Sequence, residues 1–150
     1  MEINLVLHLP RDVTSVPVSR QVLDGCLETL GVTPDTRADI ALALSEACAN
    51  VVQHAGPGEK YQVQVSAEDG RCVIEVVNAG SGAGDVRLAL NGEPVPPTAE
   101  HGRGLKIINA VVDNLQLTGN RNGVTVHFEK KLDWLPGAAG RHLFQADDGG

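Results

Sequence analysis

Two pairs of strand-like segments, each joined by a two-residue turn signal, constrain the fold of this chain most. The turn signals are Asp69-Gly70 and Asn122-Gly123, and apolar residues alternate with polar residues in the flanking segments. Asp-Gly and Asn-Gly favour tight antiparallel turns because these residues tolerate positive φ. We therefore predict two antiparallel hairpins, Tyr61–Val65 with Cys72–Val77 and Leu115–Thr118 with Val124–Leu132.

One further strand and three helices complete the pattern. Apolar residues at every second position predict a strand over 3–9, and three- to four-residue spacing predicts helices over 15–30, 34–55 and 102–114. Gly31 is expected to end the first helix, and Thr33 with Pro34 to begin the second. The apolar positions of the first helix are expected to be Val22, Cys26, Leu27 and Leu30.

These elements predict an α+β fold. The expected architecture is a two-layer sandwich, in which a mainly antiparallel (mixed) sheet carries helices packed on one face. A chain of 150 residues is long enough for one ordinary core. We predict a single domain over residues 1–135 and a flexible C-terminal tail over 136–150, which is rich in Gly, Ala and Asp.

The charge balance restricts the partners. Twelve Lys and Arg against 19 Asp and Glu leave a net charge of −7. So acidic a chain is a poor candidate for binding a nucleic-acid backbone or an anionic membrane surface. It has no signal-peptide pattern and no apolar run of membrane-spanning length, so we expect a cytoplasmic protein. The odd set Cys26, Cys48 and Cys72 lacks a CxxC pair, which favours buried thiols over disulfides or a zinc site.

A narrow polar line on the second helix is the first candidate functional feature. Glu46, Asn50 and His54 recur at four-residue spacing, so they share one face of a helix that is otherwise small or apolar, with a core stripe at Ile40, Leu44, Ala47, Val51 and Ala55. A carboxylate beside an amide suits a general base next to a neutral metal ligand. The alternative interpretation is the solvated face that any amphipathic helix needs.

Two glycine-rich segments are the second feature. Asn78-Ala79-Gly80-Ser81-Gly82 follows a strand directly, and glycines let the backbone approach a ligand closely. Gly102-Arg103-Gly104-Leu105-Lys106 opens a helix, where free backbone amides and the helix dipole favour an anion. Taken singly, these segments are also compatible with a flexible turn and with a loop that closes onto a helix.

The order of these motifs resembles the GHKL ATP-binding domain. It is most similar to the anti-sigma-factor serine/threonine kinases of bacterial partner-switching systems. Three segments carry the resemblance, which covers roughly residues 3–132: Ala43–Asn50 with His54, Gly102–Ile108, and Gly123–Val126.

The resemblance implies a role for each motif residue. Glu46 would be the catalytic base that accepts the proton of a serine or threonine hydroxyl, and Asn50 would bind Mg²⁺ beside the ATP phosphates. Residues 85–101 would form a lid over ATP. The remaining ATP-binding positions would be His54, Asn78, Gly80, Gly82, Gly102, Arg103, Gly104, Leu105 and Thr125. The implied partners are a sigma factor, an anti-anti-sigma (STAS-type) protein and a second copy of the chain.

One position departs from the family pattern. Asn78 stands where the family has an aspartate that accepts a hydrogen bond from the adenine amino group, so the charge of that acceptor is absent here. Asn78 therefore favours one alternative to a kinase, a non-catalytic module that sequesters a sigma factor or regulator. A second alternative is a small ATPase or histidine-kinase-type domain cut from a larger protein. The four aromatic residues lie outside the site motifs, so adenine is expected to lie against aliphatic side chains.

Overall fold

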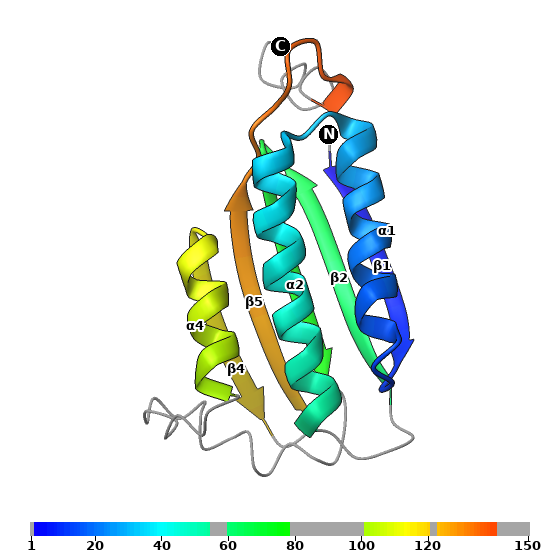
Figure 1. Ribbon diagram of the computed structural model, residues 1–150, viewed down its shortest axis with the longest axis vertical. Helices are drawn as coiled ribbons and strands as arrows, with labels where there is room; N and C mark the ends of the chain where they lie inside the picture. The colour runs from blue at the N-terminus through cyan, green and yellow to red at the C-terminus, as the bar shows by residue number, and fades with distance from the viewer. Residues whose placement is uncertain (1, 55–59, 79–100, 121–122, 141–150) are drawn as a thin grey trace.

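The computed structural model describes residues 2–54, 60–78, 101–120 and 123–140. Within these residues the chain forms a five-stranded sheet and three helices (Figure 1). The elements in chain order are β1 (Glu2–Pro10), α1 (Ser15–Leu30), α2 (Pro34–His54), β2 (Lys60–Glu68), β3 (Arg71–Asn78), α4 (His101–Val111), β4 (Asn114–Asn120) and β5 (Gly123–Lys131).

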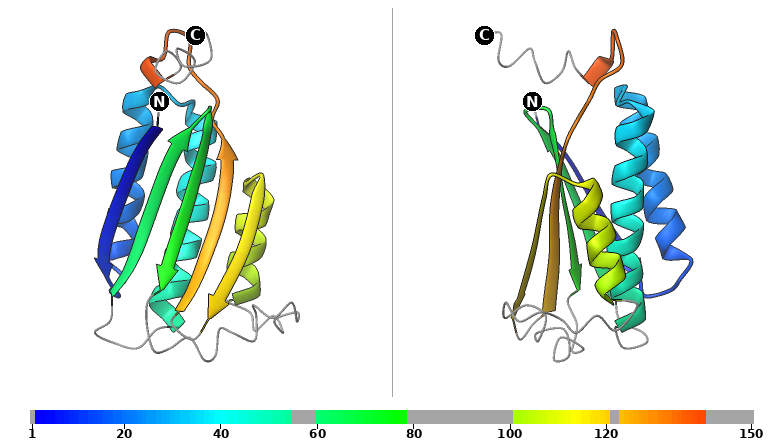
Figure 2. Two further views of the ribbon diagram at one scale, coloured as in Figure 1. Left: turned by 180° about the vertical axis from the view of Figure 1, so that it is seen from behind. Right: turned by 60° about the vertical axis from the view of Figure 1, so that its left-hand side comes forward.

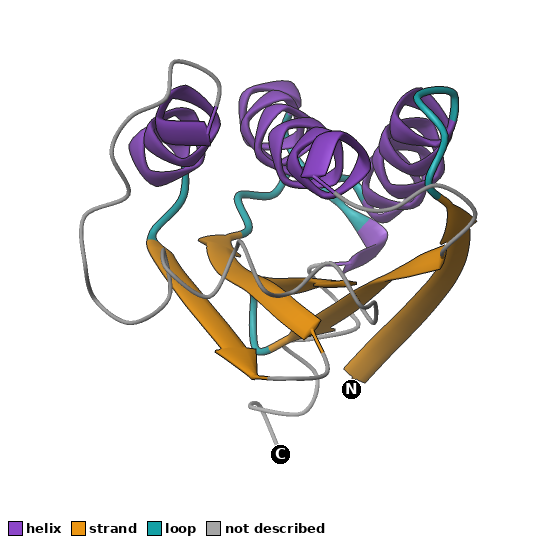
Figure 3. Ribbon diagram, turned by 90° about the horizontal axis from the view of Figure 1, so that it is seen from below, coloured by secondary structure: helices purple, strands orange, loops and turns teal. Residues whose placement is uncertain are grey.

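The sheet has the strand order β1-β2-β3-β5-β4, and its four pairings are all antiparallel. All three helices lie on one face, with α2 between α1 and α4 (Figures 1 and 3). Seen from behind, the other face of the sheet has no helix over it (Figure 2). The predicted two-layer α+β architecture is confirmed, and the described strands form a purely antiparallel sheet.

Both predicted hairpins are present. In the first, Asp69 has a φ of 53° and Gly70 a φ of 74°, which are the positive angles that a two-residue turn between right-twisted strands requires. Glu68 is paired with Arg71 across this turn. In the second hairpin Asn120 pairs with Gly123, so Gly123 begins β5 and does not belong to the turn as predicted. The two residues between them lie outside the described residues.

The buried face of α1 differs from the prediction. Val22 and Cys26 are exposed, and the buried line runs through Ser15, Ser19, Leu23 and Leu27 at four-residue spacing. The apolar pattern was misleading because two serines occupy core positions, where their hydroxyls donate to the carbonyls of Asp12 and Val16. A buried hydroxyl is tolerated when it is hydrogen-bonded in this way.

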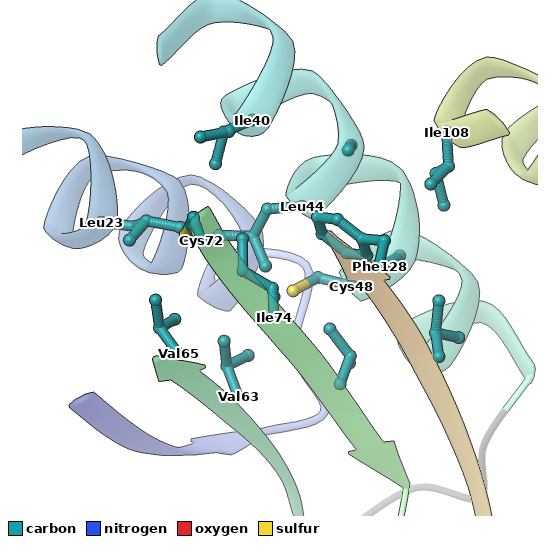
Figure 4. Packing of buried hydrophobic residues seen from close by; sticks show 14 of the residues in the cluster. Leu23, Ile40, Leu44, Cys48, Val63, Val65, Cys72, Ile74, Ile108 and Phe128 are labelled. Carbon is teal, nitrogen blue, oxygen red and sulfur yellow. The ribbon is translucent and has the colours of Figure 1, made fainter. Parts of the chain in front are cut away.

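The core lies between the helix layer and the sheet. Leu44 and Cys48 of α2 project toward Ile74 of β3 and Val63 of β2 (Figure 4). The predicted stripe of α2 is confirmed at Ile40, Leu44, Ala47 and Val51, whereas Ala55 lies outside the described residues. Cys48 and Cys72 are buried as predicted, but Cys26 is exposed, because it faces away from the sheet on α1.

Packing continues beyond residue 135, the predicted domain boundary. Ala138 is 7% exposed, and a β-carbon on Gly31 would collide with the Ala138 side chain. Gly31 also has a φ of 89°, so its lack of a side chain serves both the end of α1 and this contact. Residues 141–150 of the predicted tail lie outside the described residues. No helix among the described residues is long and apolar enough to cross a membrane.

Candidate functional site

Four element ends meet at one end of the molecule. They are the last turn of α2, the end of β3, the start of α4 and the start of β5, and they lie toward the viewer in Figure 3. The antiparallel order explains this arrangement, because α2 and β3 run toward that end while α4 and β5 leave it. The topology thus brings the predicted motifs of three separate chain segments together.

Glu46 and Asn50 lie one turn apart on α2, and both are partly exposed. Their neighbours Ala47, Cys48 and Val51 point into the core, which fixes the rotation of the helix and directs the polar line away from the sheet. Among the described residues, neither the Glu46 carboxylate nor the Asn50 amide has an ion pair or hydrogen bond. Within the part of the chain that the structure describes, both groups are therefore available to a ligand or substrate.

Gly104 of α4 lies directly against Asn50. A β-carbon built on Gly104 would stand 3.2 Å from both Nδ2 and Oδ1 of Asn50, closer than nine in ten real β-carbon contacts. The glycine therefore keeps open the space around this amide. Sequence reasoning selected both residues separately and missed their contact, which no local pattern could have indicated because 54 positions separate them in the chain.

The first turn of α4 adds a second kind of binding group. The first four N–H groups of a helix have no partner within it, and here they belong to residues 101–104, next to Asn50. No acidic residue lies in that turn. Its amides and the helix dipole can therefore receive an anion such as a phosphate group. Leu105 packs against the core and anchors the turn.

These groups fit a magnesium–phosphate ligand. Mg²⁺ is usually held by one or two protein oxygens together with substrate phosphates and water. The Oδ1 atom of Asn50 is such an oxygen, and the missing side chain of Gly104 leaves room for its amide. The described residues contain no cluster of three or more His, Cys, Asp or Glu that would form a cage made by the protein alone. The donor set suits an ion that arrives with a nucleotide.

The strand residues are placed differently from one another. Asn78 ends β3 and pairs with Tyr61 and Val124. Thr125 pairs with Val77 and Thr118, next to the buried pair Val76 and Val126. Because strand side chains alternate between faces, Thr125 lies on the face opposite the helices, and the structure does not bring it together with Glu46 and Asn50.

The remaining predicted residues are placed only by their backbone or not at all. His54 is the last residue of α2, and Gly102 and Arg103 are the second and third residues of α4. Gly80, Gly82 and the predicted lid, except its last residue, lie outside the described residues.

Comparison with known proteins agrees with this arrangement. A family profile described as "Histidine kinase-like ATPase domain" matches residues 9–130. The serine-protein kinase RsbW of Bacillus velezensis is 30% identical over 136 residues, which cover 85% of this chain and 84% of that protein. RsbW of Bacillus mycoides is 26% identical over 134 residues, which cover 84% and 83%.

Two solved structures share the fold. The RsbU and RsbW domains of a Mycobacterium tuberculosis protein match with a TM-score of 0.66 at 20% identity, over 87% of this chain and 32% of that one. The SiaB–SiaC complex from Pseudomonas aeruginosa matches with a TM-score of 0.58 at 16% identity, over 86% and 88%. The chain belongs to the histidine kinase-like ATPase family, in the group of the anti-sigma-factor kinases.

Proposed function

We propose that this protein is an ATP-dependent protein serine/threonine kinase that also acts as an anti-sigma factor. The observation that carries the proposal is the arrangement of Glu46, Asn50 and Gly104. A carboxylate and an amide without partners among the described residues stand one turn apart, beside the free amides of a helix start. The relatives named serine-protein kinase RsbW support the same activity.

Each group has a distinct task in phosphoryl transfer. Glu46 would accept the proton of the substrate hydroxyl as its oxygen forms a bond to the γ-phosphorus and the bond from that phosphorus to the bridging oxygen of ADP breaks. Asn50 would hold Mg²⁺, which supplies positive charge to the phosphates. The α4 amides and Arg103 would bind phosphate oxygens. His54, Asn78, Gly80, Gly82, Gly102, Leu105 and Thr125 stay proposed nucleotide contacts.

The partners follow from the proposed activity. We expect a sigma factor as the sequestered protein and a STAS-type antagonist as the phosphate acceptor, in the cytoplasm. One of the solved structures that share the fold is a two-protein complex, SiaB–SiaC, which supports a role in protein binding.

A homodimer is part of the proposal, and the edge of the sheet at β1 supports it. Within the described strands β1 pairs only with β2, and residues 3–9 carry no Lys, Arg, Asp or Glu to protect the edge. Four exposed valines lie on β1, on α1 or between them: Val6, Val13, Val18 and Val22. We expect light scattering to show a dimer for the wild type and a monomer for a Val6→Lys/Val18→Lys double variant. An unchanged mass for this variant would exclude this edge as the dimer interface.

A second candidate is a binding module without kinase activity. The observation that favours it is Asn78, which lacks the charge of the family's aspartate at the adenine position. Such a protein would bind its partners and transfer no phosphate.

Labelled ATP separates the two candidates. The chain is incubated with γ-labelled ATP, Mg²⁺ and candidate STAS proteins, with Glu46→Gln as the matched variant, because glutamine keeps the size and removes the basic carboxylate. We expect labelled STAS protein, and a rate roughly 10²- to 10⁴-fold lower for the variant. Equal labelling by both proteins would remove Glu46 from the mechanism. Tight partner binding without any label would select the binding module.

A further inference from the structure

A buried chain of hydroxyl and thiol groups crosses the core at the same end of the molecule as the candidate site. The Ser15 and Tyr61 hydroxyl oxygens lie 2.6 Å apart, and Ser15 donates its own proton to the Asp12 carbonyl at 2.6 Å. The Tyr61 hydroxyl must therefore donate to Ser15. Cys48 contacts the Ser19 hydroxyl at 3.6 Å, and Ser19 lies one turn after Ser15 on the buried line of α1.

These groups are buried in the core, where a polar atom without a hydrogen bond destabilises the fold. Tyr61 is 2% exposed, Ser15 4%, and both Ser19 and Cys48 are fully buried. Burial raises the pKa of the Tyr61 phenol and of the Cys48 thiol, so both keep their protons at neutral pH. Four apolar residues would fill this space without any need for matched hydrogen bonds. The polar groups instead require partners at fixed positions, so the network fixes how the joined elements lie relative to one another. Without the network, these elements could shift.

The elements it joins are those of the site. Cys48 lies on α2 between Glu46 and Asn50, on the opposite side of the helix. Tyr61 lies in β2 directly opposite Asn78, the last residue of β3. Through Ser15 and Ser19 of α1, the network thus connects the strand position opposite Asn78 with Cys48, on the helix that carries the proposed base and metal ligand.

We propose that Tyr61 is a positioning residue of the nucleotide site. Its hydroxyl, held by Ser15 of α1, fixes the distance between the end of β3 and Asn50 of α2, because the same face of α1 contacts Cys48 through Ser19. It thereby fixes the distance between the groups that meet the base and those that meet the phosphates. This inference rests on the proposed ATP site. Its consequence is that Tyr61 matters for a ligand that spans both groups and not for one that occupies the phosphate end alone.

Tyr61→Phe tests the proposal, with Thr36→Val as its matched control. The first variant keeps the ring and removes the hydroxyl. The second removes another buried hydroxyl on α2, at the opposite end of the helix, where Thr36 donates to Asp133 at 3.2 Å. Urea unfolding measures the stability of both variants, and calorimetry measures their Kd for Mg-ATP and for Mg-tripolyphosphate, a ligand without a base.

Both variants are expected to be less stable than the wild type. Only Tyr61→Phe should raise the Kd for Mg-ATP, by roughly three- to tenfold, the range for one lost hydrogen bond. Its Kd for Mg-tripolyphosphate should stay unchanged. An unchanged Kd for Mg-ATP, or an equal loss in Thr36→Val, would overturn the inference. So would equal weakening of both ligands. Ser15→Ala, which removes the acceptor of the phenol, replaces Tyr61→Phe if that variant does not fold. Failure of the wild type to bind Mg-ATP would instead refute the ATP site itself.

Discussion

The two ends of α2 differ in whether their polar side chains are paired. At its first end Arg37 donates to both carboxylate oxygens of Asp24 at 3.2 Å, and Lys130 pairs with Asp39 at 3.4 Å. At its last turns Glu46 and Asn50 have no such partner among the described residues. We call the end of α2 with Arg37 and Asp39 its paired end, and the end with Glu46 and Asn50 its open end.

The difference separates stability from function. Matched hydrogen bonds and ion pairs add to stability, whereas polar groups kept unmatched at a surface add little to it and are free to bind ligands. We expect substitutions at the open end to change nucleotide binding with little effect on stability, and substitutions at the paired end to do the reverse. Three predictions test this comparison, from the largest expected effect to the smallest.

Gly104→Val should have the largest effect. Its β-carbon would meet the Asn50 amide at 3.2 Å, and its two methyl groups would add to this crowding. A displaced metal ligand weakens binding, so we expect the Kd for Mg-ATP to rise roughly 100-fold, the upper part of the range for disturbed metal-site residues. Calorimetric titration with Mg-ATP measures the change.

Gly25→Ala is the matched control for a glycine inside a helix. A β-carbon on Gly25 of α1 has nothing within 4 Å, so its Kd for Mg-ATP should be unchanged. Gly104→Ala, which adds the β-carbon alone, should fall between the two. It also gains up to about 1 kcal/mol of helix propensity, so weaker binding by a protein of equal or higher stability would exclude unfolding as the cause. Unchanged binding by Gly104→Val would show that the open end does not bind the nucleotide through Asn50.

The elements of this fold were predictable from local signals, and the contacts between them were not. Asp69-Gly70 specified a hairpin that the structure contains, and Gly31 ended α1 as expected. The buried face of α1 was misjudged, because Ser15 and Ser19 lie in the core, where each hydroxyl donates to a carbonyl three residues earlier and Ser15 also bonds to the distant Tyr61. Hydropathy counts a serine as polar whether or not its hydroxyl is hydrogen-bonded, so hydropathy alone does not reveal this burial.

The candidate site shows the same limit. The spacing of Glu46 and Asn50 placed both on one helix face, because helical periodicity is local. The contact of Asn50 with Gly104 depends on how α4 packs on α2, which no residue pattern within either helix encodes. The strand register likewise decides that Thr125 lies on the face opposite the helices, since a shift of one residue would reverse it.

Asn78→Asp should have the next largest effect and should strengthen nucleotide binding. The substitution restores the charged acceptor that the family has at the adenine position. A charge-assisted hydrogen bond contributes about 1–3 kcal/mol, so the Kd for Mg-ATP should fall by roughly tenfold. Titration with Mg-GTP is the control, because guanine offers no amino group at the same ring position and should gain nothing. Equal affinity of wild type and variant for Mg-ATP would mean that residue 78 does not contact the base.

Arg37→Met, at the paired end, should have the smallest effect and leave binding unchanged. The variant loses the bonds to Asp24 and the bond from Nε to the Val32 carbonyl at 3.3 Å, while methionine keeps most of the aliphatic stem. Arg37 is 16% exposed but Asp24 is 40% exposed, so solvent screening limits the ion pair. We expect urea unfolding to show a loss of about 1–2 kcal/mol, mostly from the two kinds of hydrogen bond. Arg71→Met, which breaks the pair with Glu129 from a 52% exposed side chain, should lose less. If Arg37→Met weakened Mg-ATP binding as much as Gly104→Val, the two ends of α2 would not act independently, because pairing at one end would then hold the geometry of the other.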